Sequence, residues 1–300
     1  YRLHSVAGGA PGVQRAYINY FLKDPPKGDV TVTIADDQGR EVATLPGTRT
    51  AGINRVTWNM RYPGARVAKL RTRPPGNPHV VEEKRFHLQW EREGWYPIQS
   101  WGTSAGFGGF LAAPGTYTVT VKVGGREYAQ KLEVRKDPRS AGTVDNIKAQ
   151  VAMQLELRDQ LNASSDMISR IEWMKKQLAD LAEALAGRNA RDVEAAAAAF
   201  GKKLQAVEDE LFQPTIAEGD TKSFRDPQKV YEKLSVLSGD VGGNVDFAPN
   251  AQQREVQAVL KGRLDAQQAR FADLTRTDLA AFNRVLQEKG VSGIIVPAVK

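Results

Sequence analysis

The chain has 300 residues, no cysteine and a formal net charge of +7, and its hydrophobic fraction of 41% is typical of a globular protein with room for about two domains. This composition excludes disulfides, zinc–thiolate sites and cysteine nucleophiles within the chain, and no uncharged apolar run approaches the ~18 to 20 residues that a membrane-spanning helix requires. The charge is uneven, because residues 1–137 hold 20 Lys and Arg against 12 Asp and Glu, a balance of +8 that leaves −1 for the rest.

The first part of the chain has the alternation and composition of β-strands. Residues 16–22 and 29–35 are rich in β-branched and aromatic side chains, and Val30, Val32 and Ile34 share one face of the second segment. Turn-forming residues then lead into further strands, which we predict over residues 40–45, 52–60, 113–123 and 126–134. In the segment over residues 52–60, the alternation places Trp58 inward as a candidate core residue.

These segments predict about six or seven short strands with turns at intervals of ~8 to 12 residues, which is the pattern of a β-sandwich. We therefore expect an immunoglobulin- or fibronectin-like sandwich over residues 1–137. It is interrupted by a long insert, residues 65–112, which is rich in aromatic and basic residues and which we expect to form a loop.

From Thr143 onward the apolar residues repeat at helical spacing, and Thr143 itself is a candidate N-cap. The first predicted helix runs for about 20 residues. The others are predicted over residues 167–186, 192–212, 226–237 (a short one) and 250–289, with a bend near Gly262 or Thr275 in the last. Residues 138–300 are thus expected to form an all-α antiparallel bundle of long helices plus a short one.

Basic residues gather near the start of the insert, with no acidic residue before Glu82. This candidate anion-facing patch consists of Arg61, Arg66, Lys69, Arg71 and Arg73. Like charges so close together are either a solvated basic loop or an attraction for an anionic partner, such as a polysaccharide, an acidic protein or lipid headgroups. Nucleic acid is the least favoured partner, because no recognised nucleic-acid-binding motif accompanies the charges.

Aromatic residues gather in the second half of the insert. The candidate interface consists of Trp90, Trp95, Tyr96, Trp101, Phe107 and Phe110. Such residues serve to cover a sandwich edge or dock onto the helical part, to anchor an exposed protein interface, or to stack against a sugar. The sequence leaves these three alternatives open.

No constellation of catalytic or metal-binding residues is recognisable. The histidines His4, His79 and His87 have no metal-type spacing, and the serines and glycine-rich segments lack the strand-to-helix context of a nucleophile elbow or a phosphate cradle. Asp36 and Asp37 fit a hairpin turn better than a calcium loop, because the downstream bidentate glutamate is missing. We therefore expect no enzyme activity, no metal and no cofactor.

Several of these segments resemble a known family. They are residues 17–23, 29–42, 52–64 (with Asn54-Arg-Val-Thr-Trp-Asn-Met-Arg-Tyr-Pro-Gly64), 113–119, 137–139, 251–256 and 262–266. The resemblance is to the C-terminal region of large secreted bacterial proteins whose N-terminal part is a sortilin-type, BNR-repeat β-propeller, often labelled glycosyl-hydrolase-like. It implies that a propeller outside this chain carries any glycan or peptide chemistry. The chain departs from the family at the insert, which is longer than expected.

The resemblance also implies an extracytoplasmic location, whether periplasmic, secreted or on the outer surface. The beginning of the chain at Tyr1 without a signal-type segment predicts a mature or processed piece. We expect a non-catalytic accessory or scaffolding segment that contacts a protein partner or the missing propeller, C-terminal to that propeller. The alternative is a glycan-binding accessory region of a secreted carbohydrate-active or peptide-active enzyme, and oligomerisation through the last helix stays open.

Overall fold

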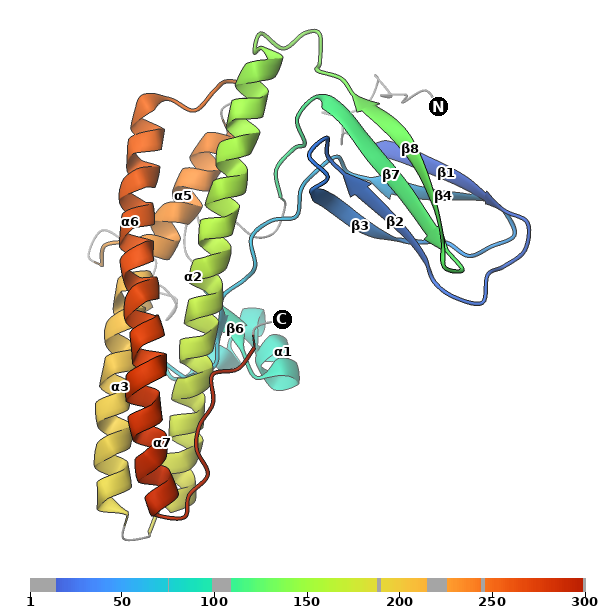
Figure 1. Ribbon diagram of the computed structural model, residues 1–300. Helices are drawn as coiled ribbons and strands as arrows, with labels where there is room; N and C mark the ends of the chain where they lie inside the picture. Colours follow the sequence, from blue (N-terminus) through green and yellow to red (C-terminus); the bar gives the residue numbers. More distant parts are fainter. Residues whose placement is uncertain are drawn as a thin grey trace. The chain divides into compact units, whose positions relative to one another are not determined.

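The computed structural model describes residues 15–74, 76–98, 109–187, 190–214, 226–243 and 246–298 (Figure 1). The protein combines antiparallel β-sheets with a helical region, which confirms the expected mixture of β and α structure. Contacts divide it into two compact units, the first of which contains the described residues 15–64, 109–154, 242–243 and 246–249. The described insert residues 65–74 and 76–98 group with the helices in the second unit, whereas the sequence placed them in the same domain as the strands.

The strands of the first unit form two antiparallel sheets. A two-stranded sheet pairs β1 (Ala16–Leu22) with β4 (Gly52–Trp58). A four-stranded sheet has the order β3-β2-β7-β8, with β2 at Val30–Ala35, β3 at Glu41–Gly47, β7 at Gly115–Val123 and β8 at Arg126–Val134. All these strands lie where the sequence predicted them.

The core of the first unit follows from the alternation of apolar side chains. Val30, Val32 and Ile34 of β2 are buried, and burying a side chain of this size stabilises the fold by ~1.5 to 3 kcal/mol. Trp58 of β4 is fully buried and its ring centroid lies 5.4 Å from that of Tyr117 of β7. Trp58 is therefore a core residue, as predicted.

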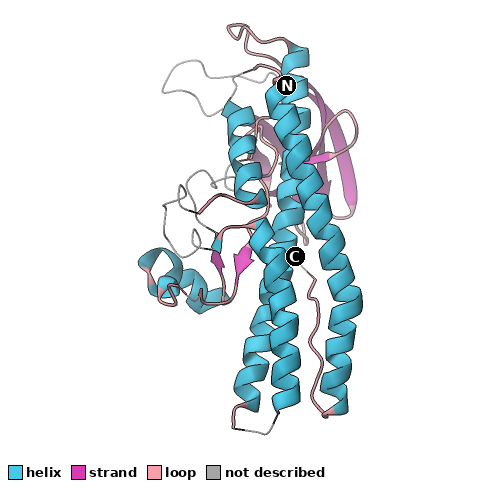
Figure 2. Cartoon of the chain, turned by 90° about the vertical axis from the view of Figure 1, so that its left-hand side faces the viewer, coloured by secondary structure: helices cyan, strands magenta, loops and turns pink. Residues whose placement is uncertain are grey.

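The insert contains regular structure that the sequence reading missed. In the second unit it forms the short strands β5 (Lys69–Leu70) and β6 (Tyr96–Pro97), a 3₁₀ turn at Val80–Glu82 and the helix α1 (Lys84–Glu93). Figure 2 shows this strand pair beside α1. Gly94 ends α1 in the left-handed conformation, with φ at 65°, which a glycine adopts without steric cost. The prediction of a loop over these residues was wrong.

The helical part starts with α2 (Val144–Leu185), a single helix of 42 residues. The Thr143 hydroxyl accepts a hydrogen bond from the Asn146 N–H at 3.1 Å, which confirms the predicted N-cap. The predicted separation into two helices before residue 167 was wrong. Ser164 and Ser165 weaken the helical pattern, but both lie buried within α2, where packing outweighs their modest helix propensity.

Four further segments complete the described helices of the second unit (Figure 2). They are α3 (Arg191–Leu211), α5 (Val230–Gly243), of which the last two residues belong to the first unit, α6 (Ala251–Asp273) and α7 (Leu279–Glu288). A π-helical turn, Leu274–Asp278, links α6 to α7 and contains Thr275, one of the two positions at which a bend was expected. Phe200 of α3 stacks on Phe282 of α7 at 5.4 Å. None of the described helices is long and apolar enough to cross a membrane.

Candidate functional site

The basic start of the insert is attached to α2 by an ion pair. Arg66 Nε donates to Asp166 Oδ1 at 2.9 Å and Nη2 donates to Oδ2 at 2.5 Å, a bidentate arrangement that fits the planar guanidinium. The hydrogen bond from Arg66 to Asp166 raises the pKa of the guanidinium. The backbone N–H of Arg66 also donates to Asn162 Oδ1 at 2.7 Å. The direction of the insert at this point is thus fixed by both side chain and backbone.

Further along the insert, α2 accepts hydrogen bonds from the backbone of the insert. Lys69 N–H donates to Ser169 Oγ at 3.0 Å, while the N–H groups of Arg71 and Thr72 donate to Glu172 Oε2 at 2.6 and 2.8 Å. The Thr72 hydroxyl donates to Glu172 Oε1 at 2.8 Å. The accepting side chains recur every three or four residues, so they lie on one face of α2.

The same cations of the insert lie over aromatic rings. Lys69 Nζ lies 5.0 Å from the ring centroid of Trp95, and Arg73 Cζ lies 5.8 Å from that of Trp90. Arg71 Cζ lies 4.0 Å from the ring centroid of a helix residue, Trp173 of α2. Such contacts contribute ~0.5 to 1 kcal/mol each at exposed sites. Over these residues, the predicted basic patch and the predicted aromatic set therefore contact each other and form one structure.

The remaining candidate residues are distributed differently. Tyr96 is buried and packs against Phe86 and Trp90, so it belongs to the interior of the second unit. Arg61 and Phe110 belong to the first unit, where Arg61 Nη1 donates to the Gly109 carbonyl at 2.9 Å and Phe110 stacks on a tyrosine ring. Trp101 and Phe107 lie outside the described residues.

Next to the attachment of the insert lies a cluster that the sequence reading missed, the carboxylate–lysine cluster of Glu172, Lys175 and Glu208. Lys175 Nζ donates to Glu172 at 2.9 Å and to Glu208 of α3 at 2.6 Å. The side chains of the two glutamates are only 2% and 1% exposed. A signal was present, because each glutamate sits on the apolar stripe of its helix, where a charged residue requires a buried partner.

The two carboxyl groups have opposite pKa shifts. Burial disfavours the ionised form of Glu172, but the charge and hydrogen bond of Lys175 and the N–H groups of Arg71 and Thr72 outweigh it and hold the pKa below its usual value. Burial and the neighbouring Glu172 charge raise the pKa of Glu208 to about 8. The opposite directions of these shifts favour a state with one carboxylate, one ammonium and one neutral carboxylic acid, in which the buried charges cancel.

The contacts of the carboxylate–lysine cluster support a structural role. Glu172 accepts hydrogen bonds from the insert and from Lys175 and also interacts with Glu208, so the carboxylate is surrounded by groups of the protein itself. Over the described ranges, no group of three or more His, Asp or Glu residues is placed to bind a metal ion. His79 and His87 each lie beside a single glutamate, and His4 is outside the described residues.

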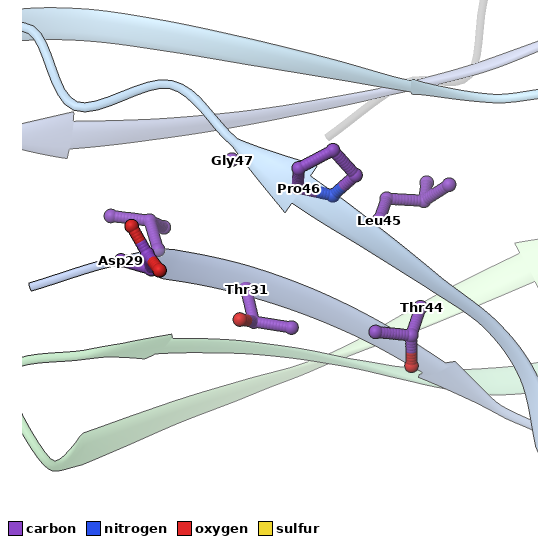
Figure 3. Close-up of a pocket in the computed structure, with 7 residues that line it drawn as sticks. Asp29, Thr31, Thr44, Leu45, Pro46 and Gly47 are labelled. Atoms are coloured by element: carbon purple, nitrogen blue, oxygen red, sulfur yellow. The ribbon is translucent and has the colours of Figure 1, made fainter. Parts of the chain in front are cut away.

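A shallow depression lies on the four-stranded sheet of the first unit (Figure 3). It is lined by residues of β2 and β3 and the position before β2: Asp29, Val30, Thr31, Thr44, Leu45, Pro46 and Gly47. Asp29 pairs with Arg49 at 3.1 Å, so its carboxylate is already engaged. The lining combines the Asp29 carboxylate and two threonine hydroxyls with apolar side chains and backbone, which is the chemistry of an ordinary strand pair.

The sequence matches no family model, no curated protein and no solved structure.

Proposed function

We propose that this chain is a non-catalytic accessory or scaffolding segment that mediates protein–protein contacts in an extracytoplasmic bacterial assembly, C-terminal to a β-propeller. The observation that carries the proposal is that basic and aromatic residues of the insert contact one another and α2. Of the predicted ligand-binding candidates, Lys69 and Arg71 contact α2, through Ser169 for Lys69 and through Glu172 and Trp173 for Arg71. The pairs Lys69–Trp95 and Arg73–Trp90 lie within the insert itself. Side chains that are engaged in contacts within the protein stabilise its framework.

For the framework itself, we propose an immunoglobulin-like sandwich followed by an antiparallel helical bundle. The contact between Trp58 of β4 and Tyr117 of β7, which joins the two sheets, supports the sandwich. The stacking of Phe200 on Phe282 and the pairing of Lys175 with Glu208 support the bundle, because each contact joins two helices. Each unit taken by itself holds its own surface residues in place, which suits an accessory segment.

Chemical cross-linking of the native protein in the cells that produce it, followed by mass spectrometry of the linked peptides, tests the proposal. We expect reproducible cross-links from this chain to one partner protein or to a propeller. Isothermal titration with a glycan panel tests the alternative, a glycan-binding function. Saturable sugar binding that is lost on Trp95→Ala, together with the absence of protein cross-links, would replace the proposed function with a glycan-binding one.

A further inference from the structure

The two-stranded sheet of the first unit presents an apolar surface to solvent. We call the outward side chains Tyr17, Asn19, Phe21, Ile53, Arg55 and Thr57 the β1–β4 outer face. Phe21 and Ile53 are directly opposite each other across the strands and are 69% and 80% exposed. The core side of β4 is supplied by other residues of the strand, among them Val56 and Trp58, which are buried. The exposed pair is therefore not needed for the core of this unit.

Beside the apolar pair lies a cation held in a defined orientation. Arg55 Nε donates to Asn19 Oδ1 at 2.9 Å, and Arg55 Cζ lies 5.1 Å from the ring centroid of Tyr17. Within the described residues, neither terminal nitrogen of Arg55 has a hydrogen-bond acceptor. These nitrogens carry the charge and the paired N–H groups that recognise a carboxylate.

The charge within the two strands of this face is of one sign. The strands β1 and β4 contain no Asp or Glu, and Arg55 is their one charged residue. Arg15 immediately before β1 adds a second exposed basic side chain. A partner with a carboxylate therefore complements this face, whereas a basic partner is repelled.

We propose that the β1–β4 outer face binds an extended acidic segment of a partner protein, an inference that rests on the proposed role in protein binding. An apolar side chain of the segment packs on Phe21 and Ile53, and a carboxylate pairs with Arg55. Ile53 and Arg55 are two residues apart on one strand, a separation of ~6.6 to 6.8 Å. The same spacing in an extended partner places its apolar residue and its carboxylate two positions apart.

The chemistry of the face favours protein over the other polymers. Single-stranded nucleic acid needs successive open ring faces along a basic groove. Here the Tyr17 ring is covered by Arg55, and the position opposite Phe21 is the aliphatic Ile53. The same lack of paired open rings disfavours sugar stacking.

Fluorescence anisotropy of the whole chain with labelled synthetic peptides tests the proposal. The probes are short Ser/Thr peptides that carry one Leu and one Asp, either adjacent, two apart or three apart, with matched peptides in which Lys replaces Asp. We expect the tightest binding for the spacing of two and none for the Lys peptides. Arg55→Gln and Ile53→Thr should each weaken binding about tenfold or more, which corresponds to ~1.4 kcal/mol.

Val259→Thr is the matched control, because Val259 is an exposed apolar residue on α6, in the other unit. It should bind the peptides like the unaltered chain. Peptide binding that is equally strong in Arg55→Gln and Ile53→Thr would overturn the assignment of the face and leave the protein-binding role standing. Preferential binding of the Lys peptides, or no binding of any peptide, would also overturn the assignment. The proposed function itself fails only if protein cross-links are absent as well.

Discussion

The sheets of the first unit and the attachment of the insert in the second are stabilised in different ways. Val30, Val32 and Trp58 form an apolar core whose pattern is visible within each short strand. The insert is held instead by charged and polar side chains, such as Arg66 and Glu172, whose partners are about 100 residues away in the sequence. An apolar core is sensitive to lost volume, whereas a buried ionic attachment is sensitive to lost partners and to pH.

The largest expected effect lies in the apolar core. Trp58→Ala removes a fully buried ring that packs on Tyr117, and it should lower the free energy of unfolding by ~3 to 5 kcal/mol, measured by urea denaturation. Phe21→Ala on the neighbouring strand is the control, because Phe21 is exposed, and it should change stability by only about 0.5 kcal/mol. Equal losses in the two variants would contradict the core assignment of Trp58.

The second largest effect is expected in the buried carboxylate–lysine cluster beside the attachment of the insert. Lys175→Met removes the cation that both buried carboxyl groups share, and it should lower the free energy of unfolding by ~3 kcal/mol. Its sequence neighbour offers a matched control. Lys176→Met breaks only an exposed pair with Asp180 and should cost less than about 1 kcal/mol. If the two lysine variants were equally stable, the cluster would have no role in holding the insert.

The pH dependence distinguishes the cluster from an apolar core. Glu208 binds a proton more tightly when folded, so its contribution to stability is complete below its ordinary pKa and is lost as pH rises through about 8. Glu208→Gln mimics the protonated acid and should remove this loss. Thermal melts at acidic and alkaline pH measure the free energy of unfolding of both proteins. Between the acidic and the alkaline end, the difference should shift in favour of the variant by on the order of 1 to 3 kcal/mol. Parallel pH profiles would contradict the assignment.

The smallest effect is expected at the exposed end of the attachment. Arg66→Gln removes a partly exposed ion pair with Asp166 and should cost ~0.2 to 1 kcal/mol. Hydrogen exchange gives the more sensitive measurement, because the Arg66 and Lys69 N–H groups should exchange faster. Arg139→Gln, which breaks a more exposed pair in the first unit, should leave those N–H groups unchanged. Unchanged exchange in Arg66→Gln would show that the backbone bonds alone hold the insert.

The strands and most of the helices could be predicted from the sequence because their signals are local. The alternation of Val30, Val32 and Ile34, and the capping hydroxyl of Thr143, need no distant partner to be recognised. The helix α1 was missed because the prolines and basic residues that precede it suggested a loop. Phe86, Trp90 and Gly94, four residues apart each time, would have indicated one apolar helix face and its terminal glycine.

The candidate site was predicted less well. The sequence identified the basic and aromatic residues of the insert but treated them as two separate surfaces. Their pairing depends on which ring lies under which cation, and for Arg71 the ring belongs to Trp173, about 100 positions along the chain. Glu172 and Glu208 were missed because a glutamate in a helix is ordinarily solvated, although their place on the apolar stripes of α2 and α3 indicated burial.

The sequence distance between the insert and its attachment on α2 has a consequence for synthesis. Arg66, Arg71 and Thr72 leave the ribosome about 100 residues before Asp166 and Glu172, and Glu208 follows later still. At ~5 to 20 residues per second, the insert waits ~5 to 20 s for its first partner. During that interval Arg66, Arg71 and Thr72 lack the partners that α2 later supplies. The same residues that fasten the finished structure are thus the ones that a nascent chain leaves open to chaperones and to premature association.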